Sequence, residues 1–276
     1  MRLTSSVCLK NTGHRTARVR VAHCFWLQLT LLSLLFFNPL ARAWAQDYQV
    51  VHCLLGCPEG VDPDNQLILR SSYALSYNER RKSADWVAYR VIADAVGIAS
   101  GLSREPLPDA FELDTLQAED FSARSEPGLI RAYYAPLLNF AATPYWYEVN
   151  YLSNAVARSE SLNRGAWFGL EWAVRNLVNR RPELFIVTGP VYRERSDQQQ
   201  LRTEKLHSVP DAFFKVVLTA GGEAAAFVLP QEVSVGVHHC ELRSHVAEIE
   251  KLTGLVLFPE RDLPLQESLA PSLGCP

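Results

Sequence analysis

The first 45 residues constrain the interpretation of this sequence most strongly, because they have the pattern of an export signal and not of a folded domain. They hold six basic residues and no acidic one, and an apolar run covers residues 25–37. Ala-Trp-Ala follows at residues 43–45, a small-x-small pattern typical of signal cleavage. We therefore expect a secretory signal peptide that is cut after Ala45. The alternatives are an uncleaved N-terminal anchor or a start codon placed too early, although about 13 apolar residues are few for a membrane span.

The remaining 231 residues predict one exported domain, secreted or periplasmic, covering residues 46–276. They hold no second apolar run of the roughly 18 residues that a membrane helix needs. The signal contains six basic residues and no acidic one, so its removal changes the net charge of the chain from −3 to −9. An acidic protein repels nucleic acid at long range, so any binding of polyanions requires a local basic patch. The candidate for such a basic patch is the segment 158–181, which has five Arg and two Glu. The alternative is that these charges lie on a solvent-exposed helix face without a binding role.

The cysteines fit an oxidising compartment. Two of the six leave with the signal, and an even number remains: Cys53, Cys57, Cys240 and Cys275. Disulfides are the usual state of such cysteines in an exported chain, and four cysteines allow three pairings. We favour Cys53–Cys57 and Cys240–Cys275, because the members of each pair are near in sequence and the second pair would hold the C-terminus.

A zinc site is the alternative use of Cys240, which lies near His238, His239 and His245. Adjacent residues of a regular strand or helix point in different directions, so His238 and His239 cannot easily face one metal ion. The disulfide is therefore the preferred reading.

Hydrophobic periodicity predicts one α+β domain in which strands dominate. Two amphipathic helices are expected, at residues 166–180 and 243–252, the second ending at Gly254. A hairpin is expected around residues 78–80, and residues 97–128 read as a long surface loop. The expected strands are residues 66–77, 84–92, 145–153, 184–188 (closed by Gly189-Pro190), 212–218 and 224–229.

Several ordered stretches of sequence resemble the DNA/RNA non-specific endonuclease family, and within it the secreted Serratia-type sugar-non-specific nucleases. The resemblance runs from about Val51 to Cys275. It implies a ββα-metal nuclease fold, with a central antiparallel sheet flanked by helices, one of which carries the metal site. It also supports the sequential disulfide pairing. The stretches are YALSY (73–77), ADWVAY (84–89), NYLSN (150–154), LNRGAW (162–167) and VTGP (187–190).

The resemblance implies cleavage of phosphodiester bonds in DNA and RNA with one Mg²⁺, for which Mn²⁺ can substitute. This chemistry needs a base for the attacking water, a metal for the leaving oxygen, and arginines for the developing charge. The family takes its base from the His of an Asp-Arg-Gly-His motif. It takes its metal ligand from the Asn of an Asn-x-Gly-x-Trp motif.

The Asn-x-Gly-x-Trp motif is intact, and it makes Asn163 the expected metal ligand. Glu171 follows at the family's spacing and is expected to orient metal-bound water. Arg175 lies one helical turn after Glu171, so the two can share a face. Arg104 resembles the family's loop arginine. The alternatives are a helix cap for Asn163 and a weak surface ion pair for Glu171 and Arg175.

The Asp-Arg-Gly-His motif is broken. Aligned on Ala135-Pro136, the chain has Ile130 at the Asp position, keeps Arg131, has Ala132 at the Gly position and has Tyr133 at the position of the catalytic His. No other His lies between residues 53 and 206. His207 belongs to a stretch that the family shares, but it lies away from the base position.

Tyrosine is a poor general base at neutral pH. Its reference pKa is about 10, so about one side chain in a thousand is ionised at pH 7, although Arg131 and Mg²⁺ could lower that pKa. Losing a positioned base costs about 10²–10⁴ in rate. We therefore expect slowed cleavage. The alternative is a catalytically inactive pseudonuclease that binds a protein partner or nucleic acid, with Tyr133 and Tyr134 stacking on bases; a homodimer is left open.

Overall fold

The computed structural model describes residues 49–111, 114–121, 128–193, 199–201, 203, 207–262 and 264–276. The predicted signal peptide lies outside these ranges, so its cleavage stays a prediction. Within them, no helix combines the length and the apolar character needed to cross a membrane.

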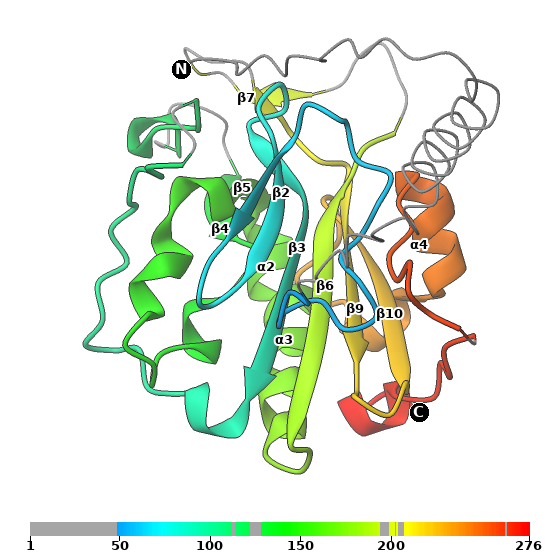
Figure 1. The fold of residues 1–276 in the computed structure, drawn as a ribbon. Coiled ribbons are helices and arrows are strands. Elements are labelled where there is room, and N and C mark those ends of the chain that lie inside the picture. Colours follow the sequence, from blue (N-terminus) through cyan, green and yellow to red (C-terminus); the bar gives the residue numbers. More distant parts are fainter. Residues whose placement is uncertain are drawn as a thin grey trace, which may run out of the picture. The chain divides into compact units, whose positions relative to one another are not determined.

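A seven-stranded sheet forms the centre of the fold, and every neighbouring pair of strands is antiparallel (Figure 1). This confirms the α+β class with a central antiparallel sheet. The strands in spatial order are β1 (Gln66–Leu69), β2 (Ala74–Asn78), β3 (Ser83–Ile92), β6 (Glu183–Val191), β9 (Ala212–Leu218), β10 (Ala224–Pro230) and β11 (Arg243–Ser244).

Helices cover both faces of the sheet, and a large apolar core lies against each face. Alternate residues of β9 show this: Phe213 and Val217 pack in the core beneath α3 (Ala166–Val178), and Phe214 and Val216 pack in the core that contains α4 (Val246–Thr253). Side chains alternate along a strand, so Lys215 points toward α3 with Phe213 and Val217. A strand buried on both faces is mostly apolar, which makes Lys215 exceptional.

A separate two-stranded ribbon carries the broken motif. Strand β4 (Leu129–Tyr133) pairs antiparallel with β5 (Ala155–Ser159), and β5 leads directly into the short helix α2 (Glu160–Arg164). Gly165 then separates α2 from α3. A Cβ on Gly165 would lie 2.6 Å from the backbone oxygen of Val235, so the glycine of the Asn-x-Gly-x-Trp motif is a packing requirement.

The remaining regular structure is short. Strand β7 (Gln200–Leu201) pairs with β8 (His207–Ser208). The 3-10 helices are η1 (Ala93–Ala95), η2 (Ala118–Phe121), η3 (Leu137–Asn139), η4 (Trp146–Asn150), η5 (Leu152–Asn154), η6 (His239–Leu242) and η7 (Ala270–Leu273).

Three of the expected strands differ from the structure. The segment 66–77 divides into β1 and β2, because a tight turn in which the amide of Arg70 donates to the carbonyl of Tyr73 (2.8 Å) reverses the chain. Residues 145–153 form η4 and part of η5 instead of a strand. Strand β6 continues through Gly189 and Pro190, which pair with β9. The other expected strands, the hairpin, and both helices agree with the structure within three residues at each end.

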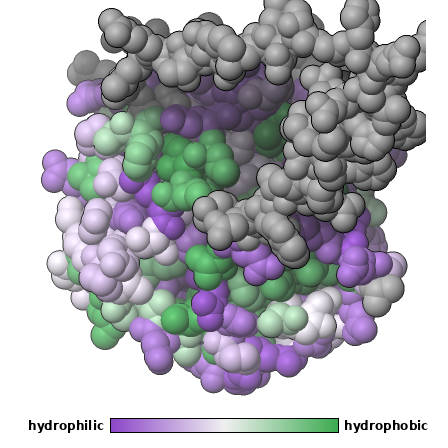
Figure 2. Space-filling view, viewed as in Figure 1, coloured by the Kyte–Doolittle hydropathy of each residue, from purple (hydrophilic) through white to green (hydrophobic). Residues whose placement is uncertain are grey.

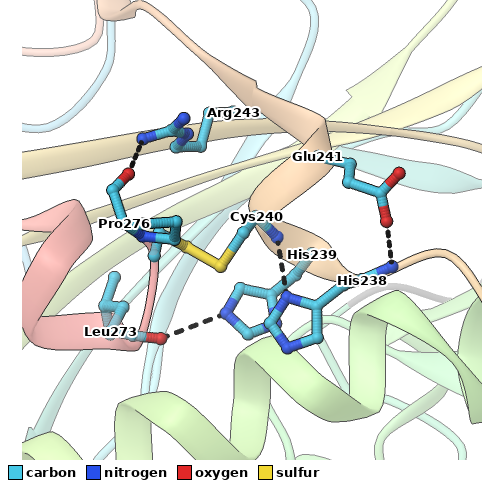
Figure 3. Close-up of a disulfide and its surroundings, with 8 residues drawn as sticks. His238, His239, Cys240, Glu241, Arg243, Leu273 and Pro276 are labelled. Carbon is cyan, nitrogen blue, oxygen red and sulfur yellow. Dashed lines mark hydrogen bonds between the residues drawn. A yellow bond between two sulfur atoms is a disulfide. The ribbon is translucent and has the colours of Figure 1, made fainter.

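Both expected disulfides are present, Cys53–Cys57 and Cys240–Cys275. The second ties the C-terminus to η6, where Arg243 also donates to the carbonyl oxygen of Pro276 at 2.8 Å (Figure 3). The ligand atoms of His238, His239 and Cys240 lie within 4.8 Å of one another, so the expectation that the two histidines point apart is wrong. The disulfide nevertheless disfavours zinc here, because the sulfur of Cys240 is bonded to Cys275 and is not a thiolate.

Candidate functional site

One cleft gathers the side chains that the motifs single out. It has a volume of about 390 Å³ and lies among β4, β5, α2, α3 and the segments around η3 and η4. Of the seven residues predicted to act in catalysis, metal binding or nucleic-acid binding, six line it: Arg104, Arg131, Tyr133, Asn163, Glu171 and Arg175. The seventh, Tyr134, does not.

Local geometry explains how these residues meet. Arg131 and Tyr133 are two positions apart on β4, so both side chains leave the same face of the strand. Asn163 lies inside α2, whose N-cap is Ser159, so Asn163 is not the cap. Glu171 and Arg175 are one turn apart on α3.

Glu171 is held by two cations at the base of the cleft, the buried Lys215 and the partly buried Arg175. Lys215 forms an ion pair with its Oε1, and the Nη1 of Arg175 lies 3.6 Å from its Oε2. Lys215 is fully buried, with its Nζ 4.0 Å from the centre of the Trp167 ring and 3.3 Å from the hydroxyl of Tyr89. Burial lowers the pKa of Lys215 to about 8, against the opposing attraction of Glu171. The pair of Glu171 and Arg175 is therefore not a surface ion pair.

Sequence reasoning missed Arg158 as a site residue. The residue is 1% exposed, and its guanidinium carbon lies over the Trp167 ring, 3.5 Å from the ring centre. Nη1 donates to Oδ1 of Asn163 at 3.2 Å, and Nη2 donates to the backbone oxygen of Tyr133 at 3.3 Å. Burial lowers the pKa of Arg158 to about 9, so the group remains a cation at neutral pH. In the sequence, Arg158 was only one member of a basic stretch.

Tyr133 is a phenol in this cleft. Burial raises the pKa of Tyr133, and this effect exceeds the opposing effects of the Arg131 charge and hydrogen bond. Arg131 does lower the pKa of Tyr133, as expected, but burial outweighs it, so the net shift is upward. At neutral pH the hydroxyl is protonated and cannot take a proton from water.

Tyr134 cannot stack on a nucleobase, contrary to the sequence-based expectation. It is fully buried, with its hydroxyl 2.8 Å from the hydroxyl of Ser83 and its ring edge-on to Phe213. Neighbouring residues of a strand point to opposite faces, so Tyr133 reaches the cleft while Tyr134 enters the core.

Two exposed aromatic side chains adjoin the cleft instead. Phe168 lines it and is 55% exposed, and Trp172 is 60% exposed one turn further along α3. Residues four apart on a helix are surface neighbours. The two exposed rings therefore lie on one face of α3, beginning at the cleft, and we call them the aromatic strip. Elsewhere, the face shown in Figure 2 mixes hydrophilic and hydrophobic residues, as most protein surfaces do.

The lining of the cleft does not fit the Mg²⁺ that the resemblance implies. Among the described lining residues, four arginines stand against the single carboxylate of Glu171, a net charge of +3. That carboxylate is paired with Lys215 and Arg175, and the oxygen of Asn163 accepts a hydrogen bond from Arg158. Mg²⁺ in proteins is held by oxygen ligands, usually including one or two carboxylates. The arrangement suits an anion.

Comparison with known proteins agrees with the fold and the motifs. The model of the DNA/RNA non-specific endonuclease family matches residues 56–262. A nuclease of Serratia marcescens is 36% identical over 251 residues, covering 87% of this chain and 92% of its own length. Nuclease C1 of Cunninghamella echinulata var. echinulata is 28% identical, covering 75% of this chain and 88% of its own.

A solved structure shows the same fold. A chain in the crystal structure of the EndoG/EndoGI complex has a TM-score of 0.62 and 24% identity, with 71% of this chain and 86% of that chain covered. The family match spans most of the described domain, and the relatives match nearly their whole length. This chain belongs to the DNA/RNA non-specific endonuclease family.

Proposed function

We propose that this chain is an exported protein that binds the phosphodiester backbone of DNA and RNA in the cleft and hydrolyses it far more slowly than a relative with a His base. The observation that carries the proposal is Tyr133, which occupies the base position as a phenol with a raised pKa. A positioned base accelerates such a reaction by about 10²–10⁴, so we expect hydrolysis by this chain to be slower by about that factor.

The arginines supply the binding. Arg104 is exposed at the rim, whereas Arg131 and Arg175 are partly buried within the cleft. A guanidinium donates two parallel hydrogen bonds to phosphate, so these residues match the non-bridging oxygens of a phosphodiester. The domain as a whole is acidic, and the cleft provides the local positive charge that binding of a polyanion requires.

The aromatic strip favours single-stranded or locally opened nucleic acid. Phe168 exposes its ring in the lining of the cleft together with the arginines, and Trp172 is exposed one turn further along α3. Stacking of a base on an aromatic side chain is worth about 1–3 kcal/mol and tolerates any sequence. A backbone phosphate in the cleft therefore leaves its neighbouring base close to Phe168.

The chemistry follows from the protonation state of Tyr133. Its phenol donates a hydrogen bond to a phosphate oxygen but does not accept the proton of an attacking water. Arg131 and Arg175 stabilise the charge that develops on the phosphate. Hydrolysis then depends on hydroxide from solution or on the small ionised fraction of Tyr133, so its rate rises with pH.

Export is supported by the N-terminal pattern and by the two disulfides. Disulfides persist in oxidising compartments and are rare in the cytosol. Cys53–Cys57 and Cys240–Cys275 are both formed in the folded domain. A secreted or periplasmic location is therefore the proposal.

The test is a digestion time course on plasmid DNA and RNA, from pH 7 to 10 with Mg²⁺ present. The native mature chain is compared with a Tyr133→His, Ile130→Asp, Ala132→Gly variant that restores the broken motif, and with Tyr133→Phe as a control that cannot ionise. We expect about 10²–10⁴ faster cleavage by the restored variant at pH 7. A complete absence of native cleavage would favour the pseudonuclease alternative, and native cleavage as fast as that of the restored variant would refute the proposal.

A further inference from the structure

The oxygen that should hold the metal is already bonded to a cation. Oδ1 of Asn163 accepts a hydrogen bond from Nη1 of Arg158 at 3.2 Å. The guanidinium is fixed in place by the backbone oxygen of Tyr133 and by the Trp167 ring. Because Arg158 is 1% exposed, its position belongs to the folded core and is not one rotamer of a mobile surface chain.

A divalent ion on the same oxygen would lie close to this guanidinium. Mg²⁺ binds oxygen at about 2.0–2.1 Å, so the two positive groups would face each other across a short, partly buried gap. Repulsion between them is strong there because solvent screens it little. Glu171 offers limited relief, since Lys215 and Arg175 already neutralise it.

The charge of Arg158 also lacks an acidic partner across the ribbon. Ile130 is directly opposite Arg158 in the β4–β5 ladder. Directly opposed side chains start about 4.5–5.5 Å apart, so an acid at position 130 would be within reach of the guanidinium. Ile130 occupies the position where the family motif has Asp. The apolar residue at position 130 therefore leaves the guanidinium next to Asn163 without an acidic partner on β4.

We propose that Arg158 replaces the metal of this site: its guanidinium excludes divalent cations from Asn163 and places a permanent positive charge in the wall of the cleft, where it attracts an oxygen of the substrate phosphodiester. The inference rests on the proposed function for the placement of the phosphate. The ligand class is a phosphodiester oxygen, held by a permanent positive charge that needs no ion from solution. Nucleic-acid binding is therefore independent of divalent metal.

The metal half of the inference is tested without nucleic acid. Mn²⁺ binding to the folded mature chain is measured by electron paramagnetic resonance for the native protein, Arg158→Gln and Arg158→Lys. We expect Arg158→Gln to bind Mn²⁺ at least about 100-fold more tightly than the native chain and Arg158→Lys, which keeps the charge. Equal Mn²⁺ affinity in the native chain and Arg158→Gln would overturn the inference.

A second variant covers the case in which Arg158→Gln does not fold, which circular dichroism reports. Ile130→Asp keeps Arg158 but gives it an acidic partner, so this variant should also gain Mn²⁺ affinity. An Ile130→Asn control lacks the charge and should not. If Ile130→Asn gained as much Mn²⁺ affinity as Ile130→Asp, the proposed pairing of an acid at position 130 with Arg158 would be contradicted.

The phosphate half is tested by fluorescence anisotropy with a labelled single-stranded oligonucleotide. The native affinity should be the same in Mg²⁺ and in EDTA, and Arg158→Gln in EDTA should bind about 10-fold more weakly. Native binding that disappears in EDTA would overturn the inference. Absence of binding in every protein and buffer would instead refute the proposed function, while the Mn²⁺ measurement would still decide the metal half.

Discussion

The buried pair of Lys215 and Glu171 determines how the base of the cleft is built. Lys215 is the one charged residue of β9, is fully buried, and contacts Glu171, Trp167 and Tyr89. Replacing Lys215 by Met keeps most of the side-chain volume but removes the ammonium group. Glu171, which is 4% exposed, then keeps only the more distant charge of Arg175 at 3.6 Å.

Two opposing contributions determine how much the free energy of unfolding should change. Removing one partner of a buried ion pair typically costs about 3–5 kcal/mol, because the other charge is left without compensation. Removing both charges also removes the cost of burying the ammonium. Burial lowers the pKa of Lys215 to about 8 even against the attraction of Glu171, so the buried ammonium carries a net cost that the double variant avoids. We therefore expect Lys215→Met to lose about 3–5 kcal/mol and Lys215→Met with Glu171→Gln to lie within about 1 kcal/mol of the native chain.

Urea unfolding at pH 7, followed by circular dichroism, measures the free energy of unfolding of the native chain, both single variants and the double variant. The four values form a double-mutant cycle that isolates the coupling between the two residues. A Lys215→Met variant within about 1 kcal/mol of the native chain would refute the reasoning, because Glu171 would then not depend on Lys215 for its charge.

Two further predictions concern acid stability and base stacking. Burial lowers the pKa of His207 to about 4, so between pH 6.5 and 4 the unfolded chain binds more protons, and up to about 3 kcal/mol of stability is lost as the pH falls through this range. Urea unfolding at pH 7, 5.5 and 4 should show this loss, smaller in His207→Phe; equal losses in both would contradict it. Trp172→Ala and Phe168→Ala should each weaken single-stranded oligonucleotide binding by about 1–3 kcal/mol in anisotropy titrations. Leu252→Ala, on α4 at the other face of the sheet, should leave binding unchanged; an equal effect there would argue against a local aromatic strip.

Elements with strong local signals were predictable from the sequence. Strands β9 and β10 are apolar runs separated by Gly221-Gly222, and α4 ends at Gly254 with a left-handed backbone. Cysteines close in sequence paired as expected. In each case a few neighbouring residues carry the information, so no knowledge of distant contacts is needed.

The segment 145–153 was not predictable in this way. Its aromatic and apolar residues alternate as in a strand, yet it forms 3-10 turns. Asn154 explains this, because its side chain donates to the backbone oxygens of Val149 (2.8 Å) and Ala135 (3.1 Å) and closes the segment onto the end of β4. Contacts between residues distant in sequence therefore override the local preference.

The site was predictable as a set of positions but not as a chemical environment. The motifs identified Asn163, Glu171 and Arg175, and the structure brings these residues together. The amino-acid sequence alone predicts neither the burial of Lys215 nor the hydrogen bond from Arg158 to Asn163. Both depend on how β5 and β9 meet α3, and both alter the charge available to a ligand.

The central claim is that the group at the base position is a neutral phenol at physiological pH. Nuclear magnetic resonance of ¹³C-labelled tyrosine rings between pH 7 and 12 measures this directly. The chain has ten tyrosines, so the missing signal of Tyr133→Phe assigns the resonance. We predict a pKa for Tyr133 above the ordinary value of about 10, with no ionisation near neutrality. A pKa of Tyr133 near 7 would contradict the account, because the phenolate would then be a competent base.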